Sequence, residues 1–316
     1  MDIDYLLWLQ GMREGSGPVV QAFFAFLGSE AATVVLALVP CFVYWCLDKE
    51  RGVLSLFAYS SSWVFNQLIK NTVCCYRPWV RNPRVTPVPS AREGATGYSF
   101  PSTHSQSAAA VLMSIGWSWR ERVWPLVACA TVTLLVGFSR NFLGVHAPQD
   151  VLVGMAEGCL FVWVALRLLS WVNEDEGREL RFMAISSLVM VLFLAYVTLK
   201  PYPMDYVGGQ LLVDPREMMV DCYKAVGGAW GILVGWFVER HWIRFDEHAT
   251  SLSERVLRMV VGLALVLLVH VPIGHALVGL AGPLAGQLVR HLLVFLMATA
   301  IVPMTFAPMR RVLQRR

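Results

Sequence analysis

Residues 139–150 read SRNFLGVHAPQD, a short polar stretch between two long apolar segments. Proline disfavours α conformation in the residue before it and is well tolerated in the first turn of a helix, so we expect a helix to begin near Pro148. His146 then lies just ahead of that helix and Asp150 in its first turn, where the carboxylate can fix one imidazole tautomer and leave the other ring nitrogen free as a nucleophile. Arg140 adds a planar guanidinium suited to phosphate. The alternative is an ordinary polar loop in which the histidine has no chemical role.

The composition places the chain in a membrane. Hydrophobic residues make up 56% of it and the mean hydropathy is +0.55, well above the usage of soluble proteins. The apolar runs are continuous and long enough to cross a hydrocarbon core, which takes about 20 residues per helix, and lipid admits only helices or closed barrels. The formal charge of +4 is dispersed, without the basic tract that nucleic-acid binding needs. We therefore expect an all-α, polytopic membrane protein with no nucleic-acid partner.

Nine spanning helices follow from the apolar runs, at 27–47, 52–70, 102–119, 123–139, 148–171, 181–199, 222–239, 255–277 and 287–308. Polar residues such as Asn66 interrupt the second helix, and inside a span they usually face the bundle interior. Met1 to Glu14 alternates apolar and charged residues and is too short to span, which predicts an interfacial amphipathic helix. We expect an interfacial N-terminal segment (1–26), a catalytic helical core (27–200) and a three-helix membrane extension packed on the core (201–316).

Charge predicts how these helices are oriented. Basic residues gather in the short loops on one side of the nine-helix arrangement and in the tail: Lys49, Arg51, Arg120, Arg122, Arg178, Arg181, Arg240, Arg244, Arg310, Arg311, Arg315 and Arg316. The positive-inside rule makes that side, and therefore the C-terminus, cytoplasmic. The stretch around His146, the loop 71–100 and the N-terminus then face away from the cytoplasm.

Two further polar clusters fall on the same outer side. Lys70 ends the second helix and Arg77 follows seven residues later, although a lysine at a helix end is more often an interfacial anchor than a ligand. Residues 101–104, PSTH, open the third helix, where free N–H groups and the helix dipole favour phosphate. Ser102 adds a hydroxyl, and His104 lies in the first turn, placed to give or take a proton. An ordinary Ser/Thr N-cap has the same pattern.

The ordered set Lys70-x6-Arg77-Pro78, Pro101-Ser102-Thr103-His104 and Ser139-Arg140-x5-His146-x3-Asp150 resembles the three signature motifs of the type 2 phosphatidic acid phosphatase (PAP2) superfamily. This superfamily includes lipid phosphate phosphatases, sphingosine-phosphate phosphatases, glucose-6-phosphatase and vanadium-dependent haloperoxidases. The resemblance runs from Lys70 to Asp150 and leaves the last three helices outside. The nine-helix layout with an outward N-terminus also resembles glucose-6-phosphatase. One departure is Thr103, where the commonest family pattern has glycine and sphingosine-phosphate phosphatases have serine.

The resemblance implies a role for each of these residues. His146 is the nucleophile that takes the phosphoryl group, Asp150 orients it, and His104 protonates the leaving oxygen. The phosphate oxygens are held by Lys70, Arg77, Ser102, Arg140 and the backbone N–H of Thr103. Phosphoryl transfer needs positioning and positive donors around the three equatorial oxygens. Three cationic side chains can supply this charge, and the sequence offers no cluster of carboxylates for magnesium, so we expect no metal and no cofactor.

The sequence leaves the substrate class open. Lipid phosphates or isoprenoid diphosphates come first, because an apolar helix bundle offers grooves for acyl or prenyl tails. Arg81, Arg84 and Arg92 in the outer loop could hold a second phosphate or be solvated charges. A small soluble phosphate ester, as in glucose-6-phosphatase, is the alternative, followed by haloperoxidase chemistry. A transporter or scramblase would explain the helices but not the phosphate motifs. We expect a multi-pass cell-membrane phosphatase acting through a phosphohistidine at the extracytoplasmic face; its oligomeric state is not indicated.

Overall fold

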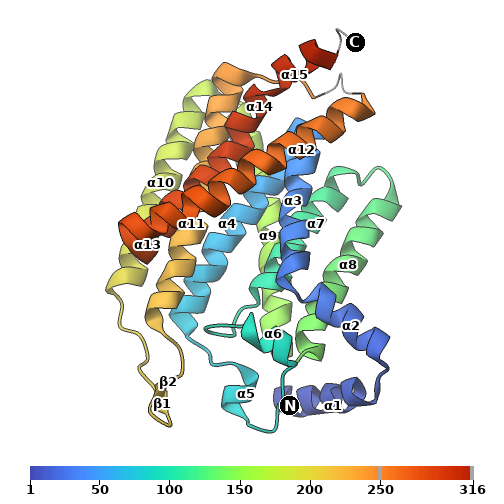
Figure 1. Cartoon of the computed structure of the whole chain (residues 1–316), viewed down its shortest axis with the longest axis vertical. Coiled ribbons are helices and arrows are strands. Elements are labelled where there is room, and N and C mark those ends of the chain that lie inside the picture. Colours follow the sequence, from blue (N-terminus) through green and yellow to red (C-terminus); the bar gives the residue numbers. More distant parts are fainter. Residues whose placement is uncertain (248–250, 314–316) are drawn as a thin grey trace.

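The computed structural model describes residues 1–247 and 251–313 and is helical almost throughout (Figure 1). The first helices are α1 (Asp2–Gly15), α2 (Pro18–Leu27), α3 (Glu30–Cys46), α4 (Lys49–Val73), α5 (Pro78–Arg81), α6 (Pro89–Glu93), α7 (Thr103–Ser118), α8 (Val123–Phe142) and α9 (Pro148–Asn173). The later ones are α10 (Glu176–Leu199), α11 (Pro215–Val238), α12 (Leu252–Leu268), α13 (Gly274–Leu296), α14 (Val302–Met304) and α15 (Phe306–Leu313). Strands β1 (Tyr206–Val207) and β2 (Gln210–Leu211) form a small hairpin, and π-helical turns follow α11, α12 and α13 at Glu239–Ile243, Val269–Ile273 and Met297–Ile301. The expected all-α fold is confirmed.

Each of the nine expected spans falls on helix, but nine membrane crossings are not confirmed. Among the described residues, four helical runs are long and apolar enough to cross a membrane: Val123–Phe142, Pro148–Asn173, Gly177–Leu199 and Leu252–Arg310. Helices α2 and α3, bent by 47° relative to each other, make a fifth if they are counted as one span. Two of the other expected spans are weak for visible reasons. Helix α7 has only 16 residues, and α4 buries the polar side chains of Asn66, Gln67 and Lys70 within its length.

The basic loops and the motif-bearing loops lie at opposite ends of the bundle (Figure 1). The connections at 47–48, 119–122 and 174–175 are at the upper end of the view, while the loop 143–147 and the segment 74–102 are at the lower end. Arg315 and Arg316 of the basic tail lie outside the described residues. Which of the two ends faces the cytoplasm stays a prediction.

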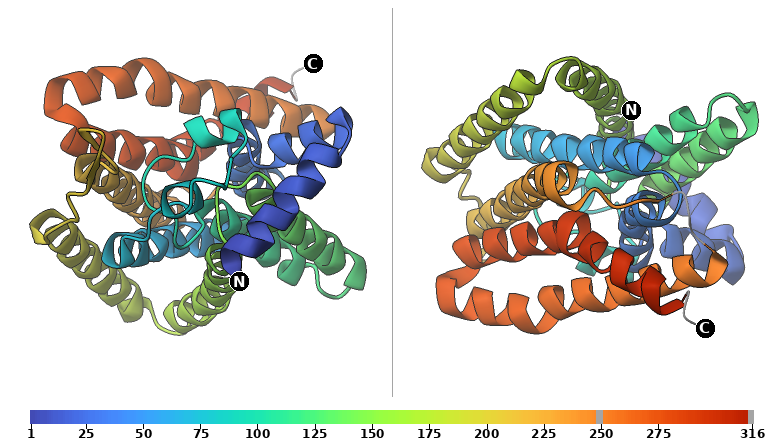
Figure 2. Two further views of the ribbon diagram at one scale, coloured as in Figure 1. Left: turned by 90° about the horizontal axis from the view of Figure 1, so that it is seen from below. Right: turned by 90° about the horizontal axis from the view of Figure 1, so that it is seen from above.

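The last two expected spans form one helical hairpin along a flank of the bundle (Figure 2). The 59-residue run Leu252–Arg310 contains both arms. Gly282 has φ of +76°, a conformation that a residue with a side chain rarely adopts, and the chain turns back there. We predicted spans at 255–277 and 287–308, and the turn falls in the gap between them.

Glycines on α11 allow the second arm of this hairpin to approach closely. At Gly227, Gly231 and Gly235, a Cβ atom would overlap atoms of the second arm. The three positions are four residues apart and so share one face of α11. Close backbone approach at small residues is a main source of helix association in lipid, where the hydrophobic effect does not drive helices together. The C-terminal extension therefore docks on the core through this glycine face.

Helix α3 adds polar attachments to the same arm. The hydroxyl of Tyr44 donates to the carbonyl of Thr299 (2.9 Å), and the indole N–H of Trp45 donates to the carbonyl of Ala298 (2.8 Å). Both carbonyls belong to the π-helical turn after α13, where the regular helical pairing of carbonyls is interrupted. Tyr44 and Trp45 are each 1% exposed, so these bonds hold the extension at a buried position.

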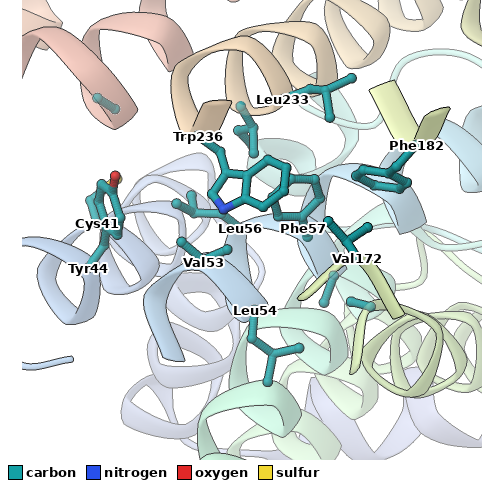
Figure 3. Packing of buried hydrophobic residues seen from close by; sticks show 14 of the residues in the cluster. Cys41, Tyr44, Val53, Leu54, Leu56, Phe57, Val172, Phe182, Leu233 and Trp236 are labelled. Atoms are coloured by element: carbon teal, nitrogen blue, oxygen red, sulfur yellow. The ribbon is translucent and has the colours of Figure 1, made fainter. Parts of the chain in front are cut away.

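The apolar core lies where α4 meets α10 and α11 (Figure 3). Trp236 of α11 stands edge-on to Phe57 of α4, with ring centroids 5.3 Å apart and planes at 85°, and Phe182 of α10 lies beside both rings. Such edge-to-face pairs add to the stabilisation that burial of the rings provides. This core lies toward the basic end of the bundle and leaves the polar residues of α4 at the other end for the candidate site.

The N-terminal segment is helical, as expected, but it packs against the motif-bearing loops. Leu6 and Leu9 of α1 are buried, and Arg13 is 7% exposed. The guanidinium of Arg13 donates to the carbonyls of Phe142 (3.0 Å) and Thr86 (2.6 Å). Helix α2 was not expected as a separate element, and the expected helix at 27–47 in fact begins at residue 30, after the bend at residues 28–29.

Candidate active site

All three motifs meet at one end of the bundle, on elements that begin or end there. They supply, in chain order, Lys70 from the last turn of α4, Arg77 from the loop after it, Ser102, Thr103 and His104 from the start of α7, Arg140 from the last turn of α8, and His146 and Asp150 from the start of α9. The N–H of Ser102 donates to the carbonyl of Asp150 at 2.9 Å, which joins the starts of α7 and α9. Six of the eight side chains are buried, while Thr103 and His104 are half-buried.

The loop before α9 turns the ring of His146 toward Asp150. Gly144 gives this loop a positive φ of 74°. Nδ1 of His146 lies 3.3 Å from a carboxylate oxygen of Asp150. The same oxygen accepts hydrogen bonds from the N–H of Ala147 (2.9 Å) and the hydroxyl of Ser99 (2.5 Å), so the carboxylate is held in place from two sides. This arrangement favours the imidazole tautomer that carries its proton on Nδ1.

The other ring nitrogen of His146 faces a cation. Nε2 lies 2.9 Å from an Nη atom of Arg77. Burial, together with the charges of Arg77 and Arg140, holds the pKa of His146 well below its ordinary value of 6.5. Burial lowers the pKa of Arg77 to about 10, which leaves its guanidinium charged at neutral pH. His146 is therefore neutral at pH 7, and the lone pair of Nε2 accepts from Arg77.

Arg77 and Lys70 also attach the long loop between α4 and α7 to the site. The guanidinium of Arg77 donates, over 3.0 to 3.1 Å, to the carbonyls of Thr96, Gly97 and Val145. Nζ of Lys70 donates to the carbonyls of Tyr98 (3.1 Å) and Pro101 (2.7 Å). Lys70 is 4% exposed, so it does not reach the lipid–water interface in the manner of a snorkelling lysine. The two cations therefore fix the loop around the imidazole of His146.

The start of α7 is capped and held against α4. The hydroxyl oxygen of Ser102 accepts from the N–H (3.4 Å) and the hydroxyl (2.9 Å) of Ser105, as an N-cap does. The Thr103 hydroxyl donates to the Asn66 side chain at 2.9 Å, and the Asn66 amide donates to Glu157 at 2.7 Å. The side chain of Thr103, at the position of the common glycine, is thus engaged with α4 inside the bundle.

His104 and Arg140 share a small cavity at the edge of the site. One Nη atom of Arg140 donates to the carbonyl of Gly28 (2.5 Å), at the bend between α2 and α3. Its Nε, and Nε2 of His104, are buried and have no hydrogen-bond partner among the described residues. The cavity has a volume of about 90 Å³ and is also lined by Glu30. Two buried donors or acceptors without partners are rare in a folded protein and mark a place where a ligand atom can bind.

Several residues that shape the site were not predicted. Ser99 holds Asp150, and the side-chain amide of Asn141 donates to the carbonyl of His146 (2.9 Å); no sequence pattern distinguishes them from loop residues. Glu157 is an acidic residue within an apolar segment, and that contrast could have identified it. Arg13 lies in a segment interpreted as interfacial, so its contact with the loop before His146 depends on tertiary structure alone.

Comparison with known proteins assigns these motifs to a family. Residues 51–174 match the PAP2 superfamily, and residues 223–314 match the transmembrane extension of PAP2 superfamily phosphatases. The first match contains all eight predicted site residues. The second covers most of α11 and the C-terminal hairpin, which the sequence motifs alone had left outside the resemblance.

The similar proteins are phosphatases of different substrates. A dihydrosphingosine 1-phosphate phosphatase of Saccharomyces cerevisiae is 24% identical over 260 residues, which are 78% of this chain and 59% of that protein. Undecaprenyl-diphosphatase BcrC of Bacillus subtilis is 38% identical over 112 residues, 35% of this chain and 52% of that protein. Glucose-6-phosphatase 3 of Bos taurus is 33% identical over 123 residues, 35% of this chain and 34% of that protein. The chain thus spans about a third to three fifths of the length of these relatives.

Proposed function

The chain carries the PAP2 superfamily domain followed by the transmembrane extension of PAP2 phosphatases, and we propose that it hydrolyses a phosphomonoester or diphosphate of a lipid or isoprenoid through a phosphohistidine intermediate. The observation that carries the proposal is the setting of His146, with Nδ1 facing Asp150 and Nε2 facing Arg77. A neutral imidazole held in this way presents a nucleophilic nitrogen beside cations that attract a phosphate. Relatives named for a sphingoid phosphate and for undecaprenyl diphosphate support the substrate class.

The proposed reaction has two steps. In the first, Nε2 of His146 bonds to phosphorus while the bond from phosphorus to the leaving oxygen breaks; that oxygen keeps the electron pair and takes a proton from His104. In the second, water attacks phosphorus and gives a proton to His104, and the phosphorus–nitrogen bond breaks to release inorganic phosphate. Asp150 holds Nδ1–H during both steps and offsets the positive charge that develops on the ring.

We propose that Lys70, Arg77 and Arg140 neutralise the phosphoryl group, with Ser102 and the N–H of Thr103 at the start of α7. Each guanidinium has five N–H donors, more than the backbone carbonyls use, and Nε of Arg140 has no acceptor among the described residues. Three cations match the charge on three equatorial oxygens, so this proposal needs no metal and no cofactor.

The remaining parts of the proposal concern location and organisation. We propose that the site faces away from the cytoplasm and that the C-terminus is cytoplasmic, because the basic loops lie at the opposite end of the bundle from the loop between α8 and α9. The chain would then be a multi-pass cell-membrane protein in contact with membrane lipids. We also propose an interfacial segment at 1–26, a catalytic core at 27–200 and an extension at 201–316.

A small soluble phosphate ester is the second candidate substrate, supported by the similarity to glucose-6-phosphatase 3. It shares the chemistry of the first candidate and differs in the leaving group. A non-enzymatic transporter or scramblase is the alternative of another class, and it has no use for a nucleophile oriented by a carboxylate.

The test is phosphate release by the purified full-length protein in detergent. The panel contains a long-chain alkyl phosphate, a prenyl diphosphate, glucose 6-phosphate and nitrophenyl phosphate, each assayed with and without a chelator. We expect turnover of at least one lipid phosphate, unchanged by chelator, and its loss in His146→Ala. A folded His146→Ala protein with near wild-type phosphate release would refute the nucleophile. Release from no ester would point to the transporter, and chelator inhibition reversed by magnesium would refute the metal-free site.

A further inference from the structure

His104 stands between two cavities of different character. On one side is the 90 Å³ cavity that it shares with Arg140 and Glu30, here called the polar cavity. On the other side is an apolar groove of about 220 Å³ between α2–α3 and α7–α8. The groove is lined by hydrophobic side chains that include Phe26, Leu36, Val39, Leu112, Val132 and Val136. A molecule whose reacting oxygen lies at His104 can therefore extend into both spaces.

The polar cavity is fixed to the proposed phosphate site. The bend between α2 and α3 forms one wall of the polar cavity. Arg140 donates a hydrogen bond to the carbonyl of Gly28 in this bend, which links the wall to a cation of the proposed phosphate site. A Cβ atom at Gly28 would lie 2.9 Å from an Nη atom of Arg140 and 2.5 Å from a methyl carbon of Leu143, so a larger residue there would displace these two side chains. An ester bound at Arg140 would thus place its leaving oxygen, and the atoms next to that oxygen, against the α2–α3 bend.

The polar cavity holds charges of both signs, the guanidinium of Arg140 and the carboxylate of Glu30, which is exposed. Glu30 is the first residue of α3, where an acidic side chain also suits the helix dipole. The structure gives Glu30 no hydrogen bond and no ion pair with any residue it describes, and the Glu30 carboxylate is the one acidic group lining the cavity. With the phosphoryl group at Arg140, the carboxylate of Glu30 favours an ammonium group over a second phosphate beside the leaving oxygen.

The loop arginines add no positive charge to the polar cavity. Arg81 pairs with Asp2 at 2.8 Å, and the guanidinium of Arg92 lies over the ring of Trp79, 5.9 Å from its centroid. Neither lines the polar cavity. The earlier alternative that these arginines hold a second phosphate therefore has no support from this side of the site.

We propose that the polar cavity and the apolar groove together form the leaving-group site, and that Glu30 selects a long-chain phosphomonoester bearing an ammonium group beside the ester oxygen over a diphosphate. The hydrocarbon chain occupies the apolar groove, because His104 lines the groove and most of its other lining side chains are hydrophobic. This inference rests on the proposed phosphatase function and names the substrate class of the same site.

The first test measures selectivity with Glu30→Gln, which keeps the shape and removes the charge. The substrates are an 18-carbon 2-amino-alcohol 1-phosphate, the 18-carbon alkyl phosphate without the amine, and a prenyl diphosphate. Glu30→Gln should lower the ratio of kcat/KM for the amino ester over the alkyl ester about tenfold, and raise relative turnover of the diphosphate. Glu93→Gln, an exposed acid of α6 that does not line the cavity, is the matched control and should leave both ratios unchanged.

The second test fills the groove. Val136→Trp should lower kcat/KM for an 18-carbon alkyl phosphate relative to a 4-carbon one by tenfold or more, since losing even two buried methylene groups costs about tenfold. Leu134→Trp on the same helix is the control, because Leu134 is 60% exposed and does not line the groove. If Val136→Trp lowers kcat/KM equally for the 18-carbon and the 4-carbon phosphate, the hydrocarbon chain does not occupy the groove. If Glu30→Gln changes kcat/KM equally for the amino ester and the alkyl ester, Glu30 does not select the ammonium group.

Failure of this inference can be told apart from failure of the proposed function. If wild-type protein hydrolyses nitrophenyl phosphate and His146→Ala does not, the phosphatase proposal stands whatever the selectivity. If the selectivity ratios then do not change in the two variants, only the leaving-group site is refuted. If wild-type protein hydrolyses none of the esters, both proposals fall.

Discussion

The surroundings of His146 oppose its protonation and should set the pH dependence of the enzyme. Burial and the charges of Arg77 and Arg140 lower its pKa well below 6.5, so the nucleophile stays neutral as the pH falls toward that value. We expect kcat/KM to fall on the acidic side, as His146 takes a proton, with a midpoint clearly below 6.5. The measurement is the pH profile of kcat/KM for nitrophenyl phosphate, whose leaving group needs no proton.

The substrate also titrates in this range, because a phosphate ester has a second pKa near 6. Repeating the profile with a nitrophenyl ester of different acidity separates the two causes. If the midpoint of the acidic limb of the pH profile is the same for both esters, a group of the enzyme titrates. If the midpoint shifts with the acidity of the ester, the substrate titrates. An enzyme limb at or above pH 6.5 would contradict the neutral, cation-flanked nucleophile.

His104 should be distinguishable from His146 by the leaving group. An alkoxide needs a proton to depart and a nitrophenolate does not, so His104→Ala should slow an alkyl phosphate about 100-fold more than nitrophenyl phosphate. His146→Ala should abolish both reactions alike. The comparison uses kcat for both variants on both substrates. Equal losses for His104→Ala on the two substrates would make His104 a phosphate ligand and not the acid.

At the scale of residues, the sequence predicted which side chains meet but not what surrounds them. His146 and Asp150 are four residues apart across a helix start, so local geometry alone brings them together. The contact between Arg77 and His146 joins residues 69 apart, and only the ordered motifs pointed to it. Ser99 and Glu30 carry no local signal, because their contacts depend on how the long loop and the α2–α3 bend fold over the site.

At the scale of elements, the docking of the C-terminal hairpin depends on backbone contact at one face of α11. Gly231→Leu should force the second arm away, since a Cβ atom there already overlaps that arm. Overpacking of this kind costs about 1–3 kcal/mol and should lower the Tm in detergent by roughly 3–10 °C. Thermal unfolding of the purified variant measures it. Gly279→Leu, at a position with open space around it, is the control, and an equal loss in both variants would argue against close docking.

The sequence located most helices well and missed the irregular ones. The starts of α7 and α9 follow from the Ser102 cap and Pro148, two local signals that the structure bears out. Helix α2 escaped notice because its ten residues are too few to span a membrane; Ser29 and Glu30 follow it, but the 47° bend itself depends on contacts at Gly28. Hydropathy cannot show such a bend, since it averages over a window longer than α2.

At the scale of the molecule, the orientation in the membrane is the open prediction. The basic loops and the site lie at opposite ends of the bundle, so the positive-inside rule places His146 outside and Arg316 inside. A tag fused after Arg316 should be protected from protease added to intact cells, and a tag inserted near Asn82 should be cleaved. Immunoblotting against each tag decides it. Cleavage of the first tag and protection of the second would reverse the topology and place the substrate in the cytoplasm.

The bonds between α3 and the C-terminal hairpin have a consequence for the order of synthesis. Tyr44 and Trp45 are synthesised early, while the carbonyls of Thr299 and Ala298 that accept their hydrogen bonds lie 255 and 253 residues later in the chain. Until the last arm has been synthesised, the Tyr44 hydroxyl and the Trp45 indole N–H therefore lack these acceptors. Chains truncated before residue 298 keep that deficit permanently. A truncated chain is therefore incomplete at α3, far from the place where its synthesis stopped.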